Sequence, residues 1–315
     1  MRDEAVVEDR VGAIQRDWGS SGLAYLTGLP SGPPGFSRAA VLGHARSTAD
    51  ELGRLLGIAV DAAELLAGRA ALLGLVRRGR VSAGGATRVI AAHDGWWALT
   101  LSRPDDVDAM PALLEAASPP DDAWDAVQRW AAGRTVAEVV QRTRLLGLPA
   151  AALAEGVADA PRVHRIGPSS APHEVSGLLV TRAGSRALFD WMNGGKLSYA
   201  VSFDESERLT ALLEAADVVI ESSQPEALCR RHLGARDVAA RAGRVWVRIT
   251  GHGVDDDAAH WSAFGDDAAV AGGLGGRSPE GPVFCGDAIA GLHAALGADT
   301  ARVDRMISER RLAPC

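Results

Sequence analysis

The sequence predicts an α/β protein with a doubly wound parallel-sheet half and a smaller α+β domain. After about residue 186, strand-like and helix-like segments alternate, which is typical of a parallel sheet with crossover helices. Before about residue 155, helical spacing of apolar residues dominates and one hairpin pattern interrupts it. A stretch rich in Gly, Pro, Ser and His lies between these parts. We therefore expect domains at 1–155 and 186–315, joined by a linker at 156–185.

The N-terminal domain begins with a short polar helix and a Gly/Pro-rich loop. The segment TRVIAAHDGWWALTLS, residues 87–102, predicts a β-hairpin that turns at Asp94 and Gly95. Asp105 or Asp106 is expected near the N-cap of the helix that follows. Helical spacing predicts helices over residues 39–57, 61–75, 104–117, 122–133 and 135–147.

The C-terminal half is expected to contain a Rossmann-like sheet. Its strands are predicted near residues 197–203, 217–221 and 244–250, with helices over 206–216 and 226–243 between them. Ligands of such sheets bind at the carboxyl ends of the strands. The loops ESSQP and TGHG lie at those ends and are the first candidates for a functional site.

Composition excludes several classes of function. The net charge of −7 argues against general binding to nucleic acid or to an anionic membrane. The 3 cysteines and 8 histidines lack the spacing of metal ligands, so we expect no metal site. The N-terminus has no apolar signal-peptide core, and no stretch has the roughly 18 apolar residues that span a bilayer, so a cytoplasmic protein is predicted.

Five segments follow one another along the chain: FDWMNGGKLSYAVSF, ADVVIESSQPEAL with HLG, RVWVRITGHG, AFGDDAAVAGGL and GPVFCGDAIAGLHAAL. In the same order, they resemble motifs of the family III CoA-transferases, the CaiB/BaiF family. Segments before residue 155 resemble the middle and C-terminal parts of the family's chain, so their order here looks permuted. The resemblance implies the family III fold, coenzyme A as a substrate rather than a permanently bound cofactor, and a homodimer.

The same resemblance implies the residues of the site. Asp287 lies four residues before Gly291-Leu292-His293 and matches the family's nucleophilic aspartate, which attacks an acyl-CoA thioester. Asp267 matches a second aspartate that the family shares, and Asp266 replaces the histidine base of alpha-methylacyl-CoA racemase. N-capping or a structural turn is the competing interpretation for each of these carboxylates. Lys196, the chain's only lysine, is a candidate ligand of a CoA phosphate. The full set of predicted CoA-binding residues is Lys196, Asn193, Ser222, Ser223, Arg230, Arg231, Gly272 and Gly273.

The resemblance implies an acyl-CoA:carboxylate CoA-transferase whose partners are an acyl-CoA and a carboxylic acid acceptor. A catalytically inactive homologue that serves as a binding or assembly subunit is the alternative. Ser222 and Ser223 stand where the family has Asn and Phe, and Glu226 replaces a glycine, which favours that alternative. A racemase-type isomerase is a third interpretation, disfavoured because the histidine is absent. The sequence does not name the acyl group.

Overall fold

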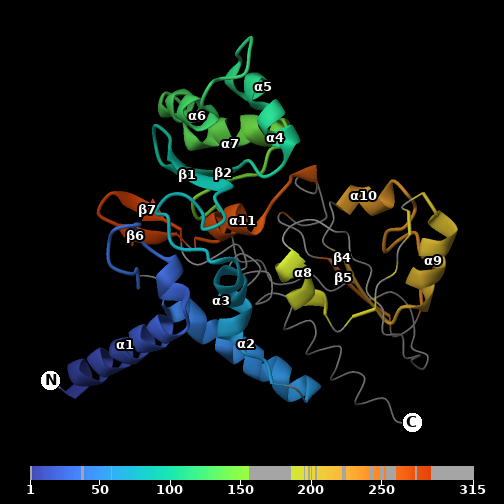
Figure 1. The fold of residues 1–315 in the computed structure, drawn as a ribbon, viewed down its shortest axis with the longest axis horizontal. Coiled ribbons are helices and arrows are strands. Elements are labelled where there is room, and N and C mark those ends of the chain that lie inside the picture. Colours follow the sequence, from blue (N-terminus) through green and yellow to red (C-terminus); the bar gives the residue numbers. More distant parts are fainter. Residues whose placement is uncertain are drawn as a thin grey trace. The chain divides into compact units, whose positions relative to one another are not determined.

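The structure is a computed structural model, in which the chain divides into two compact units, Met1–Pro161 with Ser262–Cys315, and Arg162–Trp261. It describes residues 2–36, 39–57, 59–155, 186–194, 196–197, 199, 201–202, 204–221, 225–241, 244–248, 252, 260–273 and 275–284. The first unit combines the N-terminal block with a segment more than 100 residues further along the chain (Figure 1). The sequence prediction had placed that later segment in the 186–315 half instead.

Four helical elements open the first unit and enclose a core of their own. They are α1 (Arg2–Ser20), the short 3-10 helix η1 (Leu23–Leu26), α2 (Ala40–Leu56) and α3 (Ala62–Leu73). Trp18, Leu23, Leu42 and Leu66 are buried together in this core. Helix α3 begins because the Asp61 carboxylate accepts the backbone N–H groups of Ala63 and Glu64. The predicted helices over 39–57 and 61–75 are confirmed.

A three-stranded antiparallel sheet follows, with strand order β1-β2-β3. The strands are β1 (Thr87–Ala91), β2 (Trp96–Thr100) and β3 (Ala150–Ala152). The predicted hairpin is confirmed, and its register pairs Ala91 with Trp96 and Thr87 with Thr100. Four helices accompany the sheet: α4 (Pro104–Asp108), α5 (Met110–Leu114), α6 (Ala123–Ala132) and α7 (Val136–Leu145).

The two faces of this sheet bury different partners, because side chains alternate along a strand. Ile90, Trp97 and Leu99 face α6 and α7, where they pack with residues such as Val127 and Val139. The opposite face carries Val89 and Ala98, which pack against Val270 and Phe284 of the later segment. That segment contains α11 (Gly265–Ala271) and the hairpin β6 (Gly276–Ser278) and β7 (Gly281–Val283). The later segment therefore completes the core of the N-terminal block (Figure 1).

The helix predicted over 104–117 is interrupted in the structure. Pro111 lies at the start of α5, and Ala109 separates that helix from α4. As predicted, Asp106 lies near the N-cap: it is the third residue of α4, and its carboxylate accepts the backbone N–H groups of Ser102 and of the N-cap residue Arg103 at 2.9 and 2.8 Å. The helices predicted over 122–133 and 135–147 are confirmed, with Asp122 and Thr135 as their N-caps.

The second unit contains α8 (Arg186–Asn193), α9 (Ser206–Ala215), β4 (Val218–Glu221), α10 (Pro225–Cys229) and β5 (Val245–Arg248). Strands β4 and β5 pair in parallel, from Val218 with Val245 to Glu221 with Arg248, as two of the three predicted strands require. The described residues of 197–203 are not in a strand, and the helix predicted over 226–243 ends at Cys229. A mixed α/β content is therefore present, with one parallel strand pair among the described residues.

Candidate functional site

A chain of four side-chain oxygens joins α11 to the first hairpin. Asp266 Oδ2 lies 2.9 Å from Thr87 Oγ1, and Thr87 Oγ1 lies 2.9 Å from Thr100 Oγ1. Thr100 Oγ1 in turn lies 3.0 Å from Asp267 Oδ1. The two threonines are cross-strand partners on β1 and β2, so the hairpin register presents both hydroxyls to the start of α11.

Proton counting shows what this arrangement requires. Four oxygens in a row have three gaps of hydrogen-bond length, and each gap needs one proton. The two threonine hydroxyls supply only two protons. A third proton on one carboxyl group, donated to the neighbouring threonine, completes all three hydrogen bonds. Asp267 is the carboxyl group more readily protonated, because burial disfavours the ionised form and Asp267 is 1% exposed, whereas Asp266 is half-buried.

The environment of Asp267 supports the same assignment. Burial raises the pKa of Asp267 to about 7. Hydrogen bonds that its ionised form accepts from the Phe264 N–H and the Thr100 hydroxyl oppose this shift, and the charge of Asp266 adds to it. The Phe264 N–H donates to Asp267 Oδ1 at 2.9 Å, while Oδ2 is buried without a hydrogen-bond partner among the described residues. Asp267 can therefore exchange a proton near neutral pH.

The two predicted glycines lie at the end of α11. The Gly272 N–H donates to the Ala268 carbonyl at 2.9 Å, and the Gly273 N–H donates to the Val270 carbonyl at 3.0 Å. Gly273 has a φ of +74°, which suits a residue that ends a helix. Both amides thus close the helix, and neither N–H is available to donate to CoA or to an oxyanion in this conformation.

The predicted residues of the second unit lie near helix ends. Lys196 is exposed, and its Nζ donates to Asn193 Oδ1 at 3.2 Å, while Asn193 Nδ2 donates to the Phe189 carbonyl at 3.1 Å. A cation here is favourably placed just beyond the C-terminus of α8. Arg230 and Arg231 are exposed after α10, and Arg231 Nη1 donates to the Ala227 carbonyl at 3.1 Å. Asp287, Ser222 and Ser223 lie outside the described residues.

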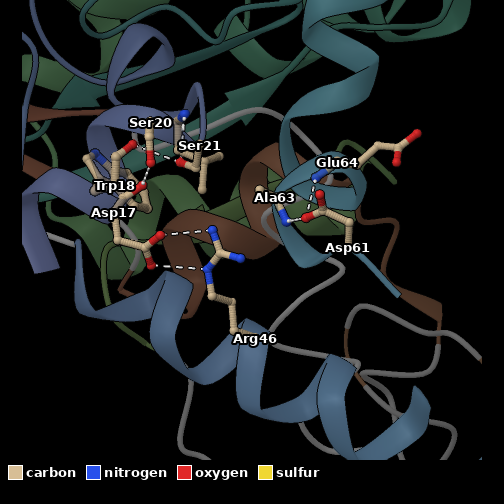
Figure 2. A network of polar contacts seen from close by, with 9 residues as sticks. Asp17, Trp18, Ser20, Ser21, Arg46, Asp61, Ala63 and Glu64 are labelled. Atoms are coloured by element: carbon tan, nitrogen blue, oxygen red, sulfur yellow. Dashed lines mark hydrogen bonds and ion pairs between the residues drawn. The ribbon is translucent and has the colours of Figure 1, made fainter. Parts of the chain in front are cut away.

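Another polar cluster lies beside a surface hollow of the first unit. The hollow has a volume of about 480 Å³, and its lining includes Ser21, Tyr25 and Asp61. Figure 2 shows the cap of α3 at Asp61 and the nearby ion pair in which Arg46 donates twice to the Asp17 carboxylate, at 3.1 and 2.8 Å. These contacts stabilise helix ends and join α1 to α2, so they assign no chemistry to the hollow.

Residues 165–309 match the family model of CoA-transferase family III. The match contains the five segments that resemble family motifs in order, but not the segments before residue 155, and it supports that family. It begins after the N-terminal block, and it includes both α11 and Asp287. Comparison with curated proteins and with solved structures found no match.

Two further observations limit the kinds of site. Within the described ranges, no group of three or more His, Cys, Asp or Glu side chains is placed to hold a metal ion. No helix in the same part of the chain is long and apolar enough to cross a bilayer.

Sequence analysis missed Thr87 and Thr100 as partners of the candidate carboxylates. Their mutual pairing could have been found, because a hairpin that turns at Asp94 and Gly95 places them opposite each other. Their pairing with α11 could not, since nothing local in the sequence indicates a contact over 167 residues.

Proposed function

We propose that the chain is an acyl-CoA:carboxylate CoA-transferase with Asp287 as its nucleophile. The observation that carries the proposal is the match of residues 165–309 to CoA-transferase family III, a range that includes Asp287 and its Gly291-Leu292-His293 motif. The parallel pairing of β4 and β5 agrees with a Rossmann-like half, which is part of the proposal, as are the homodimer and the permuted segment order.

The reaction exchanges CoA between two acids through covalent steps on Asp287. Its carboxylate attacks the thioester carbonyl of the acyl-CoA, so that a mixed anhydride forms and CoA thiolate leaves. The thiolate then attacks the aspartyl carbonyl, which releases the first acid and leaves an aspartyl-CoA thioester. The acceptor carboxylate attacks this thioester and expels CoA thiolate again. Attack of the thiolate on the acceptor's carbonyl gives the new acyl-CoA and restores Asp287.

Each tetrahedral intermediate needs donors for its oxyanion. The Gly272 and Gly273 amides already donate hydrogen bonds at the end of α11, so the proposal relies on other backbone amides of residues 269–276. The role that we propose for Asp267 is to hold or release a proton at the first turn of α11, because burial raises its pKa to about 7.

Racemase-type chemistry is less well supported. It needs a base at the position of Asp266, yet the carboxylate there accepts a hydrogen bond from the Thr87 hydroxyl at 2.9 Å. That contact ties Asp266 to Thr87 of β1. The transferase needs no base at this position.

An inactive homologue that serves as a binding or assembly subunit is the second candidate. Ser222, Ser223 and Glu226 replace the residues of the family's loop, and the carboxylate of Glu226 would repel CoA phosphates. If this candidate is right, the protein either binds CoA without exchanging it between acids, or does not bind CoA.

Mass spectrometry of the full chain after incubation with a panel of acyl-CoAs tests the proposal. A CoA or acyl adduct on Asp287, lost in Asp287→Ala and Asp287→Asn, is expected, and so is exchange of CoA into an isotope-labelled acid. Asp266→Ala is the matched control and should retain the adduct. Exchange that survives Asp287→Ala would refute the role of Asp287, and absence of any adduct or exchange would favour the inactive homologue.

A further inference from the structure

A glycine turn before β1 lies beneath two arginine side chains of the first unit. Gly85 has a φ of +85°, and its N–H donates to the Ser82 carbonyl at 2.8 Å, which closes the turn. A Cβ atom on Gly85 would lie only 2.8 Å from Arg78 Nη1, and one on Gly84 would lie 3.6 Å from Arg69 Nη2. Two guanidinium groups, from α3 and from the loop that follows it, therefore converge on adjacent glycines.

The positive charge of Arg78 at this turn is incompletely balanced. Arg78 is exposed and makes no hydrogen bond or ion pair with any residue that the structure describes. Arg88 follows on β1; its pKa is lowered mainly by burial, and the charge of Arg78 lowers it further. The Nε of Arg88 is buried without a partner among the described residues, and Asp122 is the carboxylate that partly offsets its charge.

Two neighbouring arginines show that this exposure is particular to the glycine turn. Arg77 donates to the Leu29 and Gly32 carbonyls at 3.0 and 2.7 Å, so its guanidinium is occupied in holding a loop. Arg80 donates to the Glu280 carbonyl at 3.0 Å and lies 5.0 Å from the centre of the Trp96 ring. The same basic segment thus contains arginines that stabilise packing and one, Arg78, that is directed over the turn without such a contact.

We infer that the Gly84–Gly85 turn, with Arg69 and Arg78, is a binding site for a phosphate group. Guanidinium groups match phosphate oxygens in geometry and charge, and glycines let the backbone approach a ligand closely. The backbone N–H groups of Gly84 and Ala86, on either side of Gly85, donate no hydrogen bond within the described part of the chain, so the turn also carries two amide donors without an acceptor there.

This site lies outside residues 165–309, so the family match does not assign it, and it does not depend on the proposed transferase reaction. The phosphate could be free or could belong to a nucleotide such as coenzyme A. Both sources present the same oxygens to the arginines, and the experiment must separate them.

Titration calorimetry of the full chain with inorganic phosphate, CoA and dephospho-CoA tests the inference. We expect Arg78→Gln and Arg69→Gln each to weaken binding of a phosphate-bearing ligand at least about tenfold, the loss expected for one charge-assisted contact. Arg16→Gln, which removes an exposed arginine from α1, is the matched control and should bind like the wild type.

The ligands identify the source. Weaker binding of CoA, with dephospho-CoA unaffected by the substitutions, supports the 3′-phosphate of CoA. Weaker binding of inorganic phosphate alone supports a free phosphate. Unchanged affinity for both inorganic phosphate and CoA in both variants, or no binding of either ligand by the wild type, overturns the inference. Since CoA exchange is not measured, a failure here is distinct from a failure of the proposed function.

Discussion

Substituting Asp267 with asparagine should remove a pH dependence of stability that its burial creates. The pKa of Asp267 is about 7 in the folded protein against an ordinary value of 3.8. Between these two values the unfolded chain has released the proton and the folded chain retains it, so the free energy of unfolding falls as pH rises. The difference between the two pKa values corresponds to roughly 4 kcal/mol, which is an upper limit for the loss.

Asparagine is neutral at every pH and has nearly the same shape, so its stability does not follow this titration. Its side-chain oxygen can accept the Phe264 N–H but cannot donate to Thr100, which lowers the stability of the variant by a similar amount at every pH. We expect the stability of Asp267→Asn relative to the wild type to rise by up to about 4 kcal/mol from pH 4 to pH 8. Urea unfolding followed by tryptophan fluorescence at several pH values measures this difference. Hydrogen exchange of the peptide 262–284 reports it locally.

Asp266→Asn is the informative control, since the charge of Asp266 helps to raise the pKa of Asp267. It should reduce the slope of stability against pH without abolishing it. A stability difference between the wild type and Asp267→Asn that stays constant from pH 4 to 8, or one that moves in favour of the wild type as pH rises, would refute the reasoning.

Three further substitutions test separate contacts. Thr100→Val keeps the side chain's shape but removes the hydrogen bond to Asp267, and it should cost about 1–3 kcal/mol in chemical unfolding, whereas Thr100→Ser should restore most of the loss. Gly281→Ala places a Cβ 2.7 Å from the Trp96 ring at a φ of +118°, so a loss of about 1–3 kcal/mol in thermal unfolding is expected, and an unchanged melting temperature would contradict this packing. Lys196→Ala should weaken CoA binding by roughly 1–3 kcal/mol in titration calorimetry if the ammonium binds a phosphate, and unchanged affinity would leave the lysine with its Asn193 contact alone.

Local patterns in the sequence were sufficient to predict many of the helices and the first hairpin of the first unit. The hairpin was predictable because Asp-Gly lies between two runs of strand-forming residues. The helices α3, α6 and α7 were predictable because each combines helical periodicity with an N-cap residue, namely Asp61, Asp122 and Thr135. These signals act within a few residues, so one sequence contains them completely.

The misplaced boundaries arose where local signals compete with tertiary contacts. The range 226–243 has apolar residues at helical spacing, yet α10 ends at Cys229 and Asp237 accepts the Gly234 N–H at 3.0 Å in a turn. Short polar side chains often bind nearby backbone groups in this way and interrupt a helix. The predicted site residues of the two units also could not be related to one another, since their separation is set by the fold and not by spacing in the sequence.

The hydrogen bonds between α11 and the first hairpin connect the family-matched residues to the N-terminal block that precedes them. The match to CoA-transferase family III begins at residue 165, but α11 packs on β2 and β3 of the block that precedes it. The Val270 carbonyl accepts the Ala154 N–H at 2.9 Å, and the Phe284 N–H donates to the Gly79 carbonyl at 2.9 Å.

Removing the N-terminal block would therefore expose Val270 and Phe284 and leave Asp267 without its threonine partner. Without this hydrogen bond and without the apolar residues that bury it, the carboxyl group of Asp267 is no longer held in this position. The matched residues thus depend on the block for the geometry of α11. Phe284, the last described residue before Asp287 in the sequence, is held on that block by its hydrogen bond to Gly79, so the proposal includes the N-terminal block in the framework of the site.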